Sequence, residues 1–228
     1  MRVVIMGGTS GIGLATAEQL TETGVEVFVT GRDPVRLEGL RDRFAGVEQL
    51  DGTDREAVTT FFSELGSFEH LVLAFSPGPV GAGSIREISL DDFETAFGAK
   101  LFAYVHAIRA AQVTDSITMI SAATARAAIP GSAALAAVNG AIERIVSPLA
   151  AELAPVRVNA VSPGTVDTPW WSFLPPEQRE AQFQAAGAGV PVGRVGTPAD
   201  VADAISYLIS ASFVTGTILP VDGGLTVA

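Results

Sequence analysis

Three glycines near the start of the chain are spaced to bind a phosphate group. Gly7, Gly11 and Gly13 lie in VVIMGGTSGIGLATAEQL, between a short apolar run and a segment with helical periodicity. Glycine permits positive φ and lets the backbone approach a pyrophosphate, and the following helix N-terminus offers free N–H groups to an anion. The alternative is a tight turn without a ligand. In its strand–turn–helix context the spacing favours a dinucleotide site.

The end of the second apolar run indicates which dinucleotide binds. VTGRDP has Gly31 where NAD-binding folds place an acidic residue for the ribose 2′-hydroxyl, and Arg32 follows. A guanidinium suits a 2′-phosphate because its hydrogen bonds are charge-assisted and bidentate. The alternative is a solvated surface arginine, and Asp33 would weaken a phosphate site unless it caps the next helix. We expect NADP(H) rather than NAD(H).

Short apolar runs alternate with helical patterns along the rest of the chain. We predict helices at about 11–23, 34–44, 55–65, 91–111, 132–153 and 199–210. Strands are predicted at about 3–6, 25–30, 47–50, 70–75, 116–121, 156–161 and 217–221. This alternation predicts an α/β fold, a Rossmann-type doubly wound parallel sheet of about seven strands with helices on both faces. No linker or repeat interrupts it, so residues 1–228 are expected to form a single dinucleotide-binding domain.

Residues 169–191 are the exception to this alternation. The segment is rich in Pro and aromatic residues and then in Ala and Gly, which predicts an irregular, mobile substrate lid. Trp170, Trp171 and Phe173 at its start suggest an apolar or planar ligand. The alternative is a lid that packs on its own core or on a neighbouring subunit.

The composition excludes several classes of partner. The net charge of −11 disfavours nucleic acid and anionic membranes, and the absence of cysteine excludes thiolate metal sites. We therefore expect no metal. There is no apolar run of membrane-spanning length and no charged-then-apolar leader, so the expected location is cytoplasmic.

Several ordered motifs resemble those of the short-chain dehydrogenase/reductase family. The likeness runs from Met1 to about Gly224 through GGTSGIG, LDGTD, RVNAVSPGTVDTP and FVTGTILPVDGG. It implies a seven-stranded Rossmann fold in which Asp51 holds the adenine amine and residues 163–168 border the nicotinamide carboxamide. The cofactor-binding residues that it implies are Gly7, Thr9, Ser10, Gly11, Ile12, Gly13, Arg32, Asp51, Gly52, Pro163, Gly164, Val166 and Thr168.

The same resemblance implies a catalytic Asn-Ser-Tyr-Lys set that this chain lacks. By spacing, the Ser position falls on Ala122, the Tyr position on Leu135, the Lys position on Asn139 and the Asn position on Lys100. The side chains of alanine and leucine have no proton to donate to a substrate. A positioned general acid is worth about 10²–10⁴ in rate. The chain therefore resembles a divergent member of the family that lacks the Ser-Tyr-Lys residues.

Three residues are candidate catalytic replacements. Lys100 is expected to face the nicotinamide pocket, where a cation polarises an oxygen or passes a proton; the alternative is a lysine directed to solvent or an acid. Tyr104 lies one helical turn further on, with a core or subunit-contact tyrosine as the alternative. Ser121 adjoins the lost Ser position, although strand alternation directs it to the other face.

Two functions from different classes fit these residues. One is an NADP(H)-dependent oxidoreductase with non-standard proton delivery, acting on an apolar or activated small molecule such as an iminium ion, a quinone or an enone. The other is a non-redox NADPH-binding sensor or regulatory protein, or a non-redox enzyme on the same fold. The intact segment 163–168 favours the first, which we prefer. The resemblance further implies a homodimer or homotetramer built on helices 91–111 and 132–153.

Overall fold

The computed structural model describes residues 1–227, and seven parallel strands form its single sheet. The order across the sheet is β3-β2-β1-β4-β5-β6-β7. Successive strands extend the sheet first to one side of β1 and then, from β4 onward, to the other side, so the strand order reverses between β1 and β4. Ligands of doubly wound folds bind at this switch point, outside the carboxyl ends of the strands. The predicted fold class is confirmed. The strands are β1 (Arg2–Met6), β2 (Glu26–Gly31), β3 (Gly46–Gln49), β4 (Ser67–Leu73), β5 (Gln112–Ile120), β6 (Arg157–Pro163) and β7 (Ile218–Val221).

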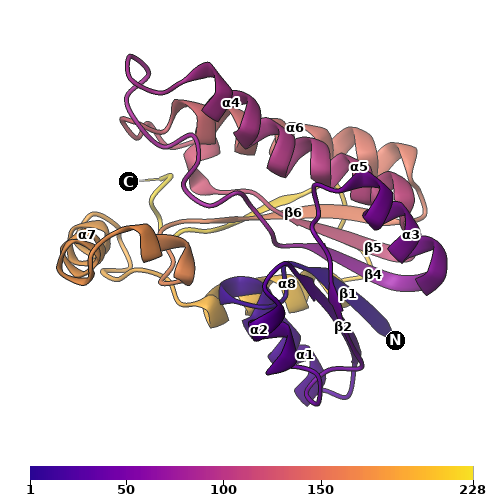
Figure 1. The fold of residues 1–228 in the computed structure, drawn as a ribbon. Helices are drawn as coiled ribbons and strands as arrows, with labels where there is room; N and C mark the ends of the chain where they lie inside the picture. Colours follow the sequence, from indigo (N-terminus) through magenta and orange to yellow (C-terminus); the bar gives the residue numbers. More distant parts are fainter. Residues whose placement is uncertain (228) are drawn as a thin grey trace.

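Helices cover both faces of this sheet (Figure 1). One face carries α1 (Gly11–Glu22), α2 (Pro34–Glu38) and α8 (Pro198–Ser210), and the other carries α3 (Arg55–Leu65), α4 (Leu90–Ala96), α5 (Ala103–Ala110) and α6 (Ala133–Glu152). Alternation along β1 feeds both cores, because Val3 and Ile5 pack on the α1 and α8 side while Val4 and Met6 pack on the opposite side.

The predicted helix 91–111 is interrupted by a π-helix, η1 (Phe97–Phe102), which lies between α4 and α5. Periodicity alone does not reveal one wide turn inside a helical pattern. π-Helical turns are rare in proteins, and those that exist are frequently found at functional sites. Here the wide turn carries Lys100, which its position in the family pattern had already made a catalytic candidate.

Two other element predictions need correction. The helix predicted over 34–44 ends at Glu38, because Gly39 follows as its C-cap and the chain continues in turns. The prediction of an irregular segment at 169–191 is wrong. It contains a short 3₁₀ turn, η3 (Pro169–Phe173), and a regular helix, α7 (Pro176–Ala188). Pro176 starts α7 at a favourable first position, and strong helix formers follow it before the glycines that end it.

Figure 1 shows α7 beyond the carboxyl edge of the sheet, on the side where β6 ends. Among residues 1–227, no helix is both long and apolar enough to span a membrane. In the same part of the chain, no three His, Asp or Glu side chains gather into a metal-binding group.

Candidate active site

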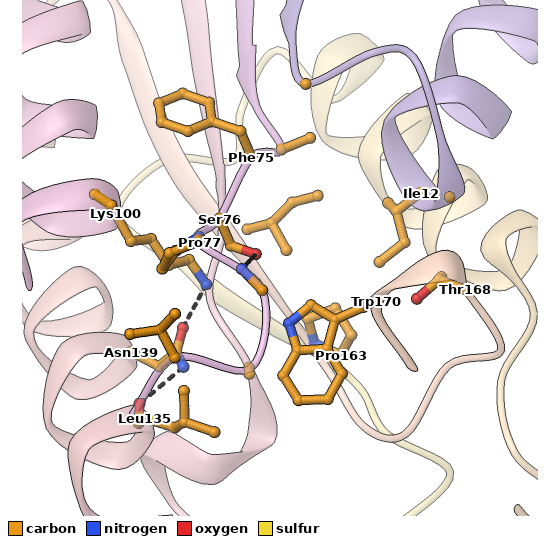
Figure 2. Close-up of a pocket in the computed structure, with 18 of the residues that line it drawn as sticks. Ile12, Phe75, Ser76, Pro77, Lys100, Leu135, Asn139, Pro163, Thr168 and Trp170 are labelled. Carbon is orange, nitrogen blue, oxygen red and sulfur yellow. Dashed lines mark hydrogen bonds between the residues drawn. The ribbon is translucent and has the colours of Figure 1, made fainter. Parts of the chain in front are cut away.

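A cavity of about 860 Å³ runs along the carboxyl ends of the central strands. Met6, Ala74, Ile120 and Pro163 bring it to the ends of β1, β4, β5 and β6. Part of its wall is drawn in Figure 2. The cavity is therefore formed at the place where this topology binds ligands.

The glycine loop forms a backbone cradle at one end of the cavity. Gly7 has a φ of 85° and Gly11 a φ of 52°, and a Cβ added at Gly13 would lie 2.2 Å from the Gly7 carbonyl oxygen. The Ser10 side chain does not cap α1, so the first N–H groups of that helix remain available to an anion. The loop therefore has the exposed N–H groups and the side-chain-free backbone that a pyrophosphate needs.

The second end of the cradle is basic and leaves no room for an acid at residue 31. A Cβ added at Gly31 would lie 2.5 Å from Thr9 Cγ2, so an acidic side chain there would displace Thr9. The Asp33 carboxylate accepts hydrogen bonds from the backbone N–H groups of Val35 (2.9 Å) and Arg36 (3.4 Å), which uses it as the cap of α2. Arg32 is exposed on the cavity wall.

Asp51 and Gly52 lie beside this basic end. Asp51 Oδ1 accepts hydrogen bonds from the Thr53 backbone N–H (2.9 Å) and hydroxyl (2.8 Å). Its partial burial opposes ionisation, but these bonds and the nearby Arg32 charge together hold its pKa below the usual range. A Cβ added at Gly52 would lie 2.7 Å from Phe75 Cζ, so the Phe75 ring packs directly on the Gly52 backbone.

The segment after β6 closes the other end of the cavity. Gly164 donates its N–H to the Val221 carbonyl at 3.0 Å, and a Cβ added at Gly164 would lie 2.9 Å from Asp222 Cα. Thr168 reaches the glycine loop, since a Cβ added at Gly11 would lie 3.2 Å from Thr168 Cβ. Figure 2 shows Thr168 beside Ile12. The resemblance implied thirteen residues for the cofactor, and twelve of them line one cavity. Gly13 packs behind it. The twelve are Gly7, Thr9, Ser10, Gly11, Ile12, Arg32, Asp51, Gly52, Pro163, Gly164, Val166 and Thr168.

Lys100 is directed inward to Asn139. Its Nζ donates a hydrogen bond of 2.7 Å to Asn139 Oδ1, as the dashed line in Figure 2 shows, and the residue is only 8% exposed. No salt bridge is found for it in the described part of the chain. Burial alone lowers the pKa of Lys100 from its ordinary 10.5 to about 8. The site therefore holds an ammonium without a carboxylate beside it.

The other two catalytic candidates have their hydroxyl protons engaged. Tyr104 is fully buried and donates to the Phe75 carbonyl at 3.0 Å, and burial raises its pKa far above the usual range. Ser121, which directly follows β5, donates to Glu143 Oε1 at 2.8 Å. Both lie against the cavity, but the geometry favours a structural interpretation for each.

The aromatic residues of η3 form one cluster on the cavity wall. Trp170 and Trp171 meet edge to face with ring centroids 4.7 Å apart, and Trp171 stacks on Phe173 and contacts Phe183. The Trp171 indole N–H donates to the Val166 carbonyl at 3.1 Å. Trp171 is thus fixed, while Trp170 extends into the cavity (Figure 2).

Comparisons with known proteins agree with this geometry. A family model described as Enoyl-(Acyl carrier protein) reductase matches residues 7–226. Cis-4-hydroxycyclohexanecarboxylate dehydrogenase from Sinomonas cyclohexanicum is 33% identical over 249 residues, with 98% of this chain and 95% of that protein covered. The 3-oxoacyl-[acyl-carrier-protein] reductase MabA from Mycobacterium tuberculosis is 32% identical over 233 residues, with 98% and 92% covered.

A solved structure shows the same likeness. The crystal structure of a small-chain dehydrogenase in complex with NADPH has a TM-score of 0.86 and 32% identity, and the match covers 100% of this chain and 99% of that one. The chain belongs to the short-chain dehydrogenase/reductase family. It is an oxidoreductase of the short-chain type, and its cofactor is a nicotinamide dinucleotide.

Compared with the short-chain dehydrogenase/reductase pattern, positions 100 and 139 have exchanged their residue types. The resemblance placed the family's Asn at residue 100 and its Lys at residue 139, and this chain has the reverse. The structure brings the exchanged pair within one hydrogen bond. The ammonium therefore reaches the site from η1 instead of from α6.

Sequence reasoning missed three features of this short-chain enzyme. The first is that Lys100 is the only lysine among its 228 residues, which a count of residue types would have shown. Arg36 joins Arg32 on the cavity wall, one helical turn after the cap. Thr124 follows the lost Ser position by two residues and lines the same wall, and its hydroxyl could have marked it as a candidate.

Proposed function

We propose that this chain is an NADPH-dependent reductase of apolar, electron-poor small molecules, with Lys100 as the charged group at the reacting end of the site. The substrate classes are iminium ions, quinones and conjugated enones. The observation that carries this proposal is the single lysine of the chain, buried beside the cavity with no carboxylate partner among residues 1–227. A buried, unpaired ammonium is unfavourable for folding, which supports a functional reason for its presence.

NADPH rather than NADH is supported by the basic end of the cradle. Arg32 and Arg36 both line it, Asp33 is engaged as the α2 cap, and Thr9 occupies the space that an acid at residue 31 would need. The solved relative with NADPH agrees with this assignment. Arg32 would hold the 2′-phosphate, the glycine loop the pyrophosphate, and residues 163–168 the nicotinamide end.

When bound, NADPH supplies one hydride, which brings two electrons to an electron-poor carbon, and the balancing proton comes from solvent. The chain contributes binding, orientation and charge. Ala122 and Leu135 leave an apolar wall where the family's Ser and Tyr are implied, so an unactivated ketone lacks a general acid. Lys100 stabilises negative charge that develops on a substrate oxygen, an electrostatic role that gains strength in a buried site.

The test is NADPH oxidation measured against a panel of ketones, imines, quinones and enones. We expect turnover of quinones and enones and little of simple ketones. Lys100→Met should lose most activity and still bind NADPH with unchanged affinity. Tight NADPH binding without turnover of any acceptor would contradict the proposal and favour a cofactor-binding regulatory role.

A further inference from the structure

A hydrogen-bonded chain of three side chains crosses the wall of the cavity. Lys100 Nζ donates to Asn139 Oδ1 at 2.7 Å, and Asn139 Nδ2 donates to Thr124 Oγ1 at 3.3 Å and to the Leu135 carbonyl at 2.8 Å. Lys100 and Asn139 are buried, whereas Thr124 is partly exposed on the cavity wall. The chain thus runs from the buried ammonium to a hydroxyl that faces the substrate space.

The ammonium determines the direction of every bond in this chain. A lysine ammonium has only donors, so it must meet the oxygen of the Asn139 amide. The two donors of that amide then point to Leu135 and Thr124. The Thr124 oxygen is therefore an acceptor in this contact, and its own O–H proton remains free for another partner.

Three other hydroxyls on this side of the cavity are already committed as donors. Ser121 donates to Glu143, Ser132 to the Ile129 carbonyl and Tyr104 to the Phe75 carbonyl. Thr124 lies in the 3₁₀ turn η2 (Ala123–Ala125), directly after Ala122. Ser76, on the loop after β4, accepts from the Gly78 N–H at 3.3 Å and is the competing hydroxyl.

We propose that Thr124 is a catalytic residue that donates a hydrogen bond to the substrate oxygen, in place of the hydroxyl missing at Ala122. This rests on the proposed function and narrows its substrate class. A free donor backed by a buried cation suits a neutral molecule with an acceptor oxygen. An iminium ion presents positive charge, which Lys100 repels. The geometry therefore points to a quinone or an enone, and Thr124 keeps its proton throughout.

The first experiment compares turnover of 1,4-naphthoquinone and cyclohex-2-enone by wild type, Thr124→Val, Thr124→Ser and Ser76→Ala. Thr124→Val preserves side-chain shape without the hydroxyl and should lower kcat/KM by about three- to tenfold, the range expected for one neutral hydrogen bond. Thr124→Ser should restore most of it, Ser76→Ala should match wild type, and the NADPH Kd should stay constant. Protonated 3,4-dihydroisoquinoline should be a poor substrate.

A second measurement tests Thr124 without turnover. Calorimetric titration of the NADP⁺-saturated protein with cyclohex-2-enone should show a Kd weakened by a similar factor in Thr124→Val and restored in Thr124→Ser. An unchanged Kd and kcat/KM in Thr124→Val, or a loss found in Ser76→Ala instead, would overturn the role of Thr124. Efficient reduction of the iminium probe would overturn the substrate class. Absence of turnover with a Thr124-dependent Kd would reject the proposed function while retaining the contact.

Discussion

At the scale of single residues, the proposed function depends on the ionisation of Lys100. Burial lowers its pKa to about 8, so an appreciable fraction of the amine is neutral in mildly alkaline solution. Because the sequence contains one lysine, lysine labelled with ¹³C at Cε gives one signal to follow by NMR. We predict a titration midpoint near 8 in the folded protein and the ordinary midpoint after unfolding. A folded midpoint near 10.5 would show that the ammonium is solvated.

The same shift predicts how stability depends on pH. The unfolded chain binds the Lys100 proton up to its ordinary pKa of 10.5, whereas the folded protein releases it near 8. Stability therefore rises with pH between these values, by about 3 kcal/mol in total at 1.36 kcal/mol per pKa unit. Lys100→Met should lack this rise. Urea unfolding at pH 7 to 10.5 measures it, and parallel profiles of wild type and variant would contradict the burial of the charge.

We predict that Arg32 selects NADPH over NADH. Hydrogen bonds to charged groups contribute about 1.5–3 kcal/mol, so Arg32→Ala should weaken NADPH binding roughly tenfold or more and leave NADH binding nearly unchanged. Arg41→Ala is the matched control, because Arg41 is exposed and paired with Glu38. Calorimetric titration with both cofactors measures these affinities. Equal losses of NADPH and NADH affinity would show that Arg32 does not bind the 2′-phosphate.

At the scale of elements, the first turn of α1 admits no side chain at Gly13. Gly13→Ala would place its methyl group 2.2 Å from the Gly7 carbonyl oxygen, so we expect a loss of more than about 2 kcal/mol in the free energy of unfolding and no NADPH binding. Gly39→Ala is the control: its φ is −69° and its nearest contact is an ordinary 3.7 Å. It should be neutral or slightly stabilising in urea unfolding. Similar effects of both changes would argue against the cradle.

Most elements could be predicted from the sequence, and the failures have physical causes. Apolar runs such as residues 3–6 read directly as buried strands, and Asp33-Pro34 marked the start of α2. The wide turn η1 was missed because one extra residue hardly disturbs helical periodicity. Helix α7 was missed because its glycines and prolines suggested a loop, although within the helix they occupy only its first and last turns.

That the glycine loop lines the cavity could be predicted, because the spacing of glycines records a backbone that side chains leave open. The contact between Lys100 and Asn139 could not, since the two residues are 39 positions apart and meet only when η1 packs against α6. The free proton of Thr124 depends in turn on that contact. Tertiary hydrogen bonds of this kind leave no local pattern in a sequence.

At the scale of the whole molecule, we propose a homodimer or homotetramer that uses the α4–α5 and α6 surface. Phe102 on η1 is 54% exposed, which indicates apolar surface left uncovered within one subunit. Light scattering at micromolar concentration should give twice or four times the 23.5 kDa of one chain. Phe102→Glu should shift the protein toward monomer. A wild-type monomer under these conditions would contradict the proposal.

We propose that the substrate, rather than a tyrosine, supplies the reactivity in this short-chain enzyme. The most direct measurement is the ratio of kcat/KM for cyclohex-2-enone to that for cyclohexanone, in wild type and in a variant with Ala122→Ser, Leu135→Tyr, Asn139→Lys and Lys100→Asn. Reversing the exchanged pair avoids two ammonium groups at one hydrogen-bond distance. We predict a high ratio in wild type and a gain in cyclohexanone reduction by part of the ~10²–10⁴ that a general acid provides. Reduction of cyclohexanone by wild type as fast as the enone would contradict the claim.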